Sequence, residues 1–185
     1  EGKSAVERVV CENDAFDADL VIVGIGIIPN SELAEKAGIA CENGITVDER
    51  CQTSIPQIYA AGDCTNHPNP LLNRRLRLES VPNAMEQARV CASNMVGKDK
   101  IYSSIPWFWS DQYELKLQMV GFSSDGDSEI IRGDMDANQF SVFHVKENKV
   151  MAADSVNSPK DFMICKQLIG KEVDLDKLLD ESIEL

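Results

Sequence analysis

The short apolar run at residues 20–23 constrains the fold of this chain more than any other feature. It reads Leu-Val-Ile-Val and continues into Gly-Ile-Gly at 24–26, before Pro-Asn at 29–30 breaks it. A short β-branched run that ends in glycines is typical of a strand buried on both faces of a parallel α/β sheet. The run therefore predicts an α/β architecture for the first half of the chain.

The rest of the first hundred residues fits this architecture. A helix is predicted over 31–37, and short strands are predicted over 44–47 and 58–61. Residues 64–77 hold two prolines and three asparagines without an apolar period, so they predict a long loop. Pro82 suits the first turn of a helix, and alanine, methionine and cysteine recur at helical spacing up to Met95, before Gly97.

The second half of the chain has a different pattern. A charged, serine-containing linker near 98–106 is followed by several strand-like segments and then by one amphipathic helix around Phe162–Ile169. Strands followed by a helix, without βαβ alternation, predict a small α+β domain. The expected fold class is thus α/β followed by α+β, with an antiparallel sheet and helices in the second part. The predicted strands cover 107–113, 116–122, 129–132, 139–145 and 149–156, and the acidic segment 172–184 is expected to turn Leu175, Leu178 and Leu179 inward.

Charge and composition exclude several classes of function. The chain has 31 acidic and 18 basic residues, a formal net charge of −13, which disfavours a nucleic-acid partner. Its apolar run at 20–28 is far shorter than the ~20 residues of a membrane span. The six cysteines form no CxxC pair and there are two histidines, so we expect no metal site. Reduced, mostly buried thiols indicate a cytoplasmic protein.

Two segments combine residues that can bind a ligand. Gly62 and Asp63 end the segment 58–63, where a strand would open into a crevice and a carboxylate could accept hydrogen bonds from ligand hydroxyls. The segment Glu79–Ala84 enters the strongest predicted helix, whose free N–H groups favour an electron-rich atom. From local chemistry alone, an ordinary turn and an ordinary helix cap explain these segments as well.

Taken together, four motifs resemble a known family. The segments 53–64 and 20–26 resemble the second FAD motif and the last NAD(P)H-domain strand of pyridine nucleotide-dependent flavoprotein reductases. The segments 77–88 and 106–113 are similar to those of one branch, the ferredoxin and rubredoxin reductases that serve oxygenase systems. The motifs occur in family order, and the resemblance covers essentially the whole chain.

The resemblance implies roles for individual residues. It implies that Asp63, beside Gly62, binds the ribityl-phosphate region of FAD. It implies that the backbone at Val81 meets the pyrimidine edge of the flavin, where the helix N-terminus would stabilise negative charge. It also implies that Trp109 packs beside the isoalloxazine ring. Glu79 and Gly26 are expected near the nicotinamide of NAD(P)H.

The resemblance also implies a domain layout. Residues 1–29 would end the NAD(P)H-binding domain, 30–100 would form the C-terminal part of the FAD-binding domain, and 104–185 would form the C-terminal reductase domain. The glycine-rich motifs of the family's N-terminal half are absent, and Gly-Ile-Gly at 24–26 lacks the third glycine. The FAD and NAD(P)H sites are therefore expected to be incomplete in this chain, and the chain alone is expected to be inactive.

The implied activity is that of an FAD-dependent NAD(P)H:ferredoxin (or rubredoxin) oxidoreductase. Two alternatives stay open: a related flavoprotein that reduces a small molecule or senses redox state, and a non-catalytic partner-binding or dimerisation module, a homodimer being one arrangement. Arg74, Arg75 and Arg77 form the one dense basic patch. They predict either docking of an acidic iron–sulfur carrier, or pairing with nearby acids or a place along the FAD crevice. No catalytic side chain is expected, since the flavin supplies the chemistry.

Overall fold

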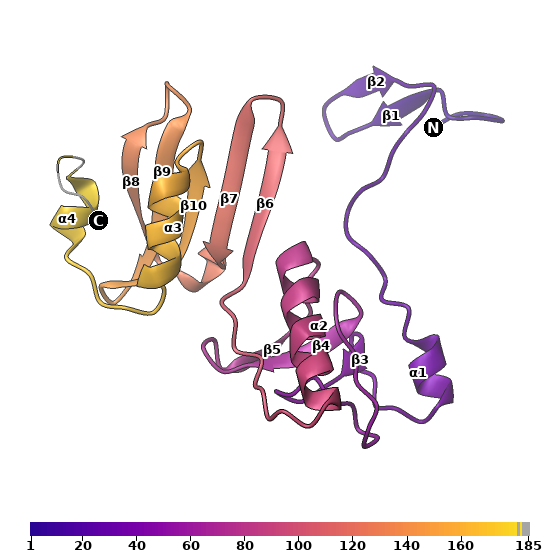
Figure 1. Cartoon of the computed structure of the whole chain (residues 1–185). Helices are drawn as coiled ribbons and strands as arrows, with labels where there is room; N and C mark the ends of the chain where they lie inside the picture. Colours follow the sequence, from indigo (N-terminus) through magenta and orange to yellow (C-terminus); the bar gives the residue numbers. More distant parts are fainter. Residues whose placement is uncertain (181, 183–185) are drawn as a thin grey trace.

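The computed structural model describes residues 1–180 and 182, and its elements follow the chain in three groups (Figure 1). A small hairpin stands at the N-terminus on an extended arm. A mixed α/β group follows, and an antiparallel sheet with two helices completes the chain. The first two groups contain β1 (Arg8–Val10), β2 (Ala15–Asp17), α1 (Glu32–Lys36), β3 (Ile45–Thr46), β4 (Thr65–Asn69), β5 (Arg74–Leu76) and α2 (Val81–Met95).

The C-terminal group is a five-stranded antiparallel sheet with strand order β6-β7-β10-β9-β8. Helix α3 packs on one face, and Phe143 and Val120 are fully buried in the core between them. This confirms the predicted antiparallel sheet with its helix and the mixed α/β fold class. The elements are β6 (Trp107–Gln112), β7 (Leu115–Gly121), the 3-10 turn η1 (Ser123–Asp125), β8 (Ser128–Asp134), β9 (Gln139–Lys146), β10 (Lys149–Val156), α3 (Pro159–Leu168) and α4 (Leu175–Leu179).

Helix α2 confirms the strongest helix prediction, but its buried face differs from the predicted one. The Ser80 side chain accepts the Asn83 N–H at 3.3 Å, and the chain leaves the helix through Gly97 with φ of +82°. The apolar positions of the predicted face, such as Met95, are largely exposed. Of that face only Cys91 is buried, and it lies beside Asn83, Gln87 and Val90, because residues 48–69 pack against this side.

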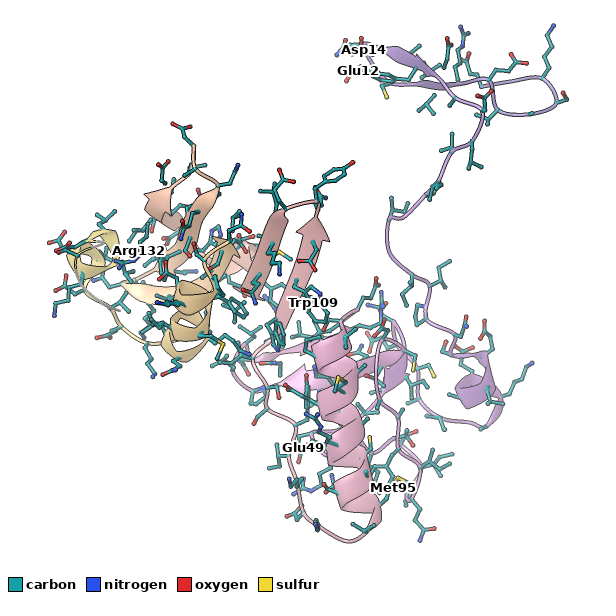
Figure 2. The ribbon with its side chains drawn as sticks, turned by 45° about the horizontal axis from the view of Figure 1, so that its top comes forward. Glu12, Asp14, Glu49, Met95, Trp109 and Arg132 are labelled. Atoms are coloured by element: carbon teal, nitrogen blue, oxygen red, sulfur yellow. The ribbon has the colours of Figure 1, made fainter. Side chains whose placement is uncertain are left out.

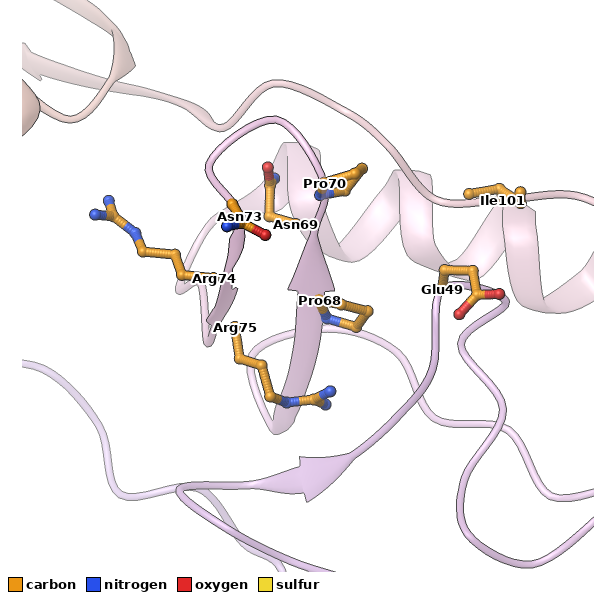
Figure 3. A pocket seen from close by; sticks show the side chains of 8 residues that line it. All are labelled: Glu49, Pro68, Asn69, Pro70, Asn73, Arg74, Arg75 and Ile101. Carbon is orange, nitrogen blue, oxygen red and sulfur yellow. The ribbon is translucent and has the colours of Figure 1, made fainter.

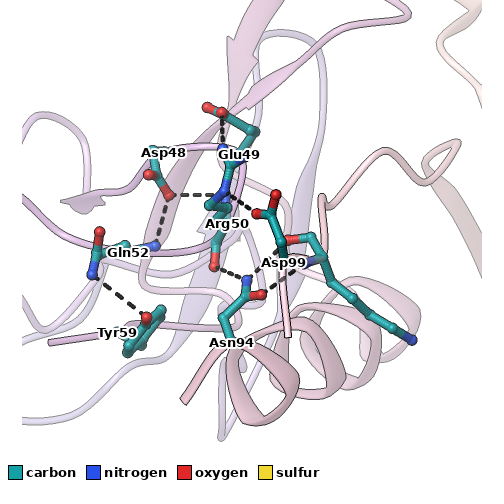
Figure 4. A network of polar contacts seen from close by, with 8 residues as sticks. Asp48, Glu49, Arg50, Gln52, Tyr59, Asn94 and Asp99 are labelled. Carbon is teal, nitrogen blue, oxygen red and sulfur yellow. Dashed lines mark hydrogen bonds and ion pairs between the residues drawn. The ribbon is translucent and has the colours of Figure 1, made fainter. Parts of the chain in front are cut away.

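A polar network joins the C-terminal end of α2 to the turn at residues 48–52 (Figure 4). The Asn94 side-chain amide donates to the Arg50 carbonyl oxygen at 2.9 Å. The Arg50 guanidinium pairs with Asp99 at 2.6 Å and lowers the pKa of that carboxyl group. The Asp48 carboxylate accepts the backbone N–H groups of Arg50 and Gln52, both at 2.8 Å. The network fixes where α2 ends.

Two predicted strands of the parallel sheet do not form here. Residues 20–28 are extended but unpaired and exposed, with Ile22 at 87% exposure. Residues 58–61 form a single bridge, between Tyr59 and Gln52. A strand buried on both faces needs neighbouring strands and covering helices. The described residues provide neither for 20–28. For 58–61 they provide α2 on one side but only a single bridge in place of a paired strand.

The predicted loop 64–77 is wrong, because this segment contains β4 and β5. These strands pair antiparallel, His67 with Leu76 and Asn69 with Arg74, and β4 also pairs parallel with β3. The buried side chains of β4 are polar, and the Asn66 amide donates to the Glu42 carbonyl oxygen at 2.6 Å. Polar partners rather than an apolar pattern stabilise these strands, so periodicity could not reveal them.

The acidic C-terminal segment packs partly as predicted. In α4 the Leu178 side chain is buried, and Leu175 packs against the same core. Leu179 is exposed at 55%, so its predicted inward orientation is wrong. Residues 181 and 183–185 of this segment lie outside the described residues. Among the described helices, none is long and apolar enough to cross a membrane.

Candidate functional site

The start of α2 and strand β6 together form a small cavity of about 180 Å³. Figure 2 shows Trp109 at the end of β6 that lies beside α2. Three of the residues assigned to cofactor binding, Glu79, Val81 and Trp109, line this cavity together with Ser80 and Phe108. They come from two parts of the chain separated by the linker 98–106, so only the folded chain brings them together.

The first turn of α2 leaves one backbone donor available. Pro82 has no N–H, the Asn83 N–H bonds the Ser80 side chain, and the Ala84 N–H bonds the Ser80 carbonyl oxygen at 3.1 Å. Among the described residues, the Val81 N–H has no acceptor. An unpaired donor at the positive end of a helix dipole favours an electron-rich or negatively charged atom.

The aromatic wall of the cavity is anchored in the C-terminal core. Trp109 is 45% exposed, and its ring lies 5.5 Å from that of Trp107, centroid to centroid. Trp107 in turn lies 5.7 Å from Phe162 of α3, and the Lys166 ammonium sits 4.4 Å from the Trp107 ring centre. These contacts hold the Trp109 ring at the cavity while leaving part of its surface open to a flat ligand.

Glu79 and Gly26 lie side by side at the edge of the cavity. Gly26 has a φ of +107°, and a Cβ atom added there would lie 3.6 Å from the Glu79 Oε2 atom. The Arg77 guanidinium holds the same carboxylate at 2.9 Å. The pair that the resemblance assigns to the nicotinamide is therefore adjacent in space, although the residues are far apart in sequence.

Gly62 and Asp63 lie against the next turn of α2. The Gly62 N–H donates to the Gln87 Oε1 atom at 2.7 Å, and a Cβ atom added to Gly62 would lie 3.6 Å from the Ala84 Cβ. Asp63 is exposed, and its carbonyl oxygen accepts a hydrogen bond from Arg77 at 3.3 Å. Arg77 thus links the Glu79 carboxylate to the backbone of Asp63.

Sequence reasoning missed the residues that support these groups. Gln87 is fully buried, and its Oε1 atom also accepts the Thr65 hydroxyl at 2.8 Å, while its buried Nε2 atom has no partner among the described residues. Ser80 and Phe108 line the cavity itself. Gln87 lies one helical turn beyond Asn83, so the two polar residues share one face of α2. This spacing is the one signal in the sequence that could have indicated a polar contact on that face.

The three arginines of the basic patch make ion pairs and hydrogen bonds with other residues of this chain. Arg74 pairs with Asp125, and Arg75 donates to the Asn66 side chain at 3.1 Å and to the Val47 carbonyl oxygen at 2.7 Å. Arg77 pairs with Glu79. The expected pairing with nearby acids therefore holds for Arg74 and Arg77, whereas the partners of Arg75 are neutral. Docking of a carrier by the patch stays a prediction.

A larger cavity of about 510 Å³ lies beside the tip of the β4–β5 hairpin (Figure 3). Its wall includes Pro68, Pro70 and Ile101, and in Figure 3 the Arg74 guanidinium points away from the other lining residues. It contains none of the residues assigned to cofactor binding. Within the described part of the chain, no group of three metal-ligating side chains occurs.

The cavity at α2 fits one part of a flat aromatic cofactor with polar edges. The indole ring of Trp109 offers a stacking surface, the Val81 N–H offers a donor, and the glycine at position 26 leaves space beside Glu79. Complete small-molecule sites usually enclose about 300–1,000 Å³, so about 180 Å³ is a partial site. The residues present therefore fit part of FAD, the flat flavin ring and its polar edge, and not the whole cofactor.

Comparison with known proteins gives two family matches that together cover most of the chain. Residues 1–88 match the pyridine nucleotide-disulphide oxidoreductase model, and residues 107–185 match the reductase C-terminal model. The chain belongs to the pyridine nucleotide-disulphide oxidoreductase family and carries that family's reductase C-terminal domain.

Individual relatives agree with this assignment. Putidaredoxin reductase CamA from Pseudomonas putida is 47% identical over 97% of this chain and 43% of its own length. Rhodocoxin reductase from Rhodococcus erythropolis is 43% identical over 88% of this chain and 38% of its own length. The crystal structure of the ferredoxin reductase for the CYP199A2 system from Rhodopseudomonas palustris aligns with a TM-score of 0.92 at 37% identity, over all of this chain and 46% of that one. The chain spans less than half the length of these relatives.

Proposed function

We propose that this chain is the C-terminal part of an FAD-dependent NAD(P)H:ferredoxin (or rubredoxin) oxidoreductase. The observation that carries the proposal is the cavity in which Val81 and Trp109 meet, with Glu79 at its edge. Relatives named as reductases of putidaredoxin and rhodocoxin support an iron–sulfur carrier as the acceptor. A covalent complex of putidaredoxin reductase with putidaredoxin, which aligns with a TM-score of 0.87 at 47% identity over 96% of this chain and 43% of that one, supports it too.

Each residue has a defined task in the proposed enzyme. The Val81 N–H donates to the pyrimidine edge of the flavin, and the α2 dipole stabilises negative charge there. Trp109 forms a ring wall that orients the nicotinamide against the flavin. Asp63 accepts hydrogen bonds from the ribityl-phosphate region. Bound FAD supplies the hydride acceptance and the release of single electrons.

Glu79 and Gly26 serve the nicotinamide side of the site. The absence of a side chain at Gly26 leaves room for the ring, and Arg77 fixes the Glu79 carboxylate. In the proposed domain layout, 1–29 belongs to the NAD(P)H-binding domain, 30–100 to the FAD-binding domain and 104–185 to the reductase domain. A cytoplasmic location accords with the free cysteines.

The experiment uses the longer protein that the length of the relatives implies, with flavin content and anaerobic reduction by NADH as readouts. Asp63→Ala should weaken FAD retention by about 1–3 kcal/mol, because ligand hydroxyls lose their acceptors. Trp109→Ala should retain FAD but slow hydride transfer by roughly 100-fold, since a displacement of about 1 Å can have that effect.

Exposed residues of β6 and of the turn that follows it provide matched controls. Tyr113→Ala removes a fully exposed aromatic ring, and Asp111→Ala removes an exposed carboxylate, so both should retain flavin and rate. If Trp109→Ala and Tyr113→Ala give the same hydride-transfer rate, the cavity at α2 is not the flavin site.

A further inference from the structure

One ion pair joins the β4–β5 hairpin to the C-terminal sheet. The two terminal guanidinium nitrogens of Arg74 donate to the two carboxylate oxygens of Asp125 at 2.8 Å and 2.9 Å. Arg74 lies on β5 and Asp125 on η1, 51 residues later. The Asp125 side chain is only 16% exposed, so the pair is better shielded than an ordinary surface ion pair.

The same arginine is connected to the candidate site through two aromatic rings. Its guanidinium lies 5.1 Å from the centre of the Phe122 ring. Phe122 packs against Phe108 with ring centroids 6.1 Å apart, and Phe108 lines the cavity with Val81 and Trp109. Arg74 therefore supports the wall of the cavity that belongs to the C-terminal sheet.

Around this ion pair the hairpin and the sheet are loosely packed. A cavity of about 360 Å³ separates them, with Leu71, Asp125 and Met151 among its lining residues. Nearby, the Asn69 side-chain amide of β4 donates to the carbonyl oxygen of Ser104, in the linker that leads into β6, at a long 3.3 Å. Because few other atoms join the hairpin to the sheet here, the bidentate ion pair between Arg74 and Asp125 strongly determines the distance between them.

We propose that Arg74 is a positioning residue, which through Asp125 and Phe122 holds Phe108 and Trp109 against the start of α2. This assigns Arg74 to the assembly of the site rather than to docking of a carrier. The importance of the cavity for flavin rests on the proposed function, whereas the contact between the two parts of the chain does not.

The chemistry requires arginine at this position. A planar guanidinium can make two parallel hydrogen bonds to one carboxylate and stack on an aromatic ring at the same time. A lysine ammonium keeps the charge but offers neither the fork nor the flat face. Arg74→Lys should therefore behave more like Arg74→Ala than like the original chain.

The test measures access of acrylamide to Trp109 in the 185-residue chain. The chain has two tryptophans, so a Trp107→Phe background makes Trp109 the one fluorophore. Arg74→Ala and Asp125→Ala should each raise the quenching constant, up to the doubling that 45% exposure of Trp109 allows. Arg89→Ala, which removes an exposed arginine from α2, is the matched control and should leave quenching unchanged.

A charge exchange separates positioning from general destabilisation. The double variant Arg74→Asp with Asp125→Arg can re-form the ion pair with its charges reversed, but it loses the stacking on Phe122. Its quenching constant should therefore fall below those of both single alanine variants and stay above that of the original chain. Equal quenching in Arg74→Ala and Arg89→Ala would overturn the proposal, as would a double variant quenched as strongly as Arg74→Ala. None of these readouts uses a cofactor, so an absence of flavin from the longer protein would count against the proposed function alone.

Discussion

His67 offers the sharpest quantitative test of the structure. Its side chain is 1% exposed, both ring nitrogens lack hydrogen-bond partners among the described residues, and its ring lies 5.0 Å from that of Tyr102 in an edge-to-face arrangement. Burial lowers the pKa of His67 from 6.5 to about 4, and the nearby charge of Arg75 adds to this effect. The folded chain therefore excludes the proton that the unfolded chain accepts.

The sign and size of the pH effect follow from this pKa difference. Between pH 6.5 and about 4 the unfolded chain binds more protons at His67 than the folded chain, so acidification destabilises the fold. The loss begins as the pH falls through 6.5 and amounts to about 3 kcal/mol near pH 4. Above pH 6.5 both states are neutral at this residue and no loss occurs.

The assay compares urea unfolding of the original chain with that of His67→Phe. Phenylalanine keeps a ring beside Tyr102, removes the titrating group and removes the two unpartnered nitrogens, so stability at neutral pH should be unchanged or higher. The advantage of the variant should grow by about 3 kcal/mol between about pH 7.5 and pH 4. His144→Gln, which removes the other histidine, is the control and should keep the acid sensitivity. An advantage of His67→Phe that does not change with pH would refute the reasoning.

Two further outcomes are expected. Phe143→Ala should lower the free energy of unfolding of the C-terminal sheet by about 3–5 kcal/mol, because the ring is fully buried between sheet and α3; tryptophan fluorescence during urea unfolding measures this, and a loss below about 1 kcal/mol would contradict the described core. In the native chain, a thiol reagent should label exposed Cys11 first and the fully buried Cys51 and Cys165 last, and burial raises the pKa of Cys165 to about 12; mass spectrometry of labelled peptides checks the order, and early labelling of Cys165 would show the core to be open.

The local sequence pattern predicted those elements that carry their own end signals or that pack, through apolar side chains, on a neighbouring element of this chain. Helix α2 carries its own proline and serine signals, and the C-terminal strands alternate against a helix that follows them directly. The strand at 20–23 failed because its burial depends on neighbours that the described residues do not provide. The β4–β5 hairpin failed because polar contacts such as Asn66 with Glu42 stabilise it.

The candidate site shows the same division. Motifs identified Val81, Trp109 and Glu79, which the fold brings to one cavity. The contacts of Gln87 with Gly62 and of Arg77 with Asn43 could not be predicted, because each joins segments remote in sequence. Gln87 lies 25 residues from Gly62, and Arg77 lies 34 residues from its partner Asn43.

If this chain supplies the flavin-facing part of an NAD(P)H-dependent reductase, an anaerobic titration of the longer protein with NADH and NADPH, followed by addition of an oxidised ferredoxin, should show it. We expect one FAD per chain, bleaching of the visible flavin absorbance by at least one of the two coenzymes, and recovery of that absorbance as the carrier is reduced. A longer protein without flavin, or a flavin that neither coenzyme reduces, would contradict this proposal.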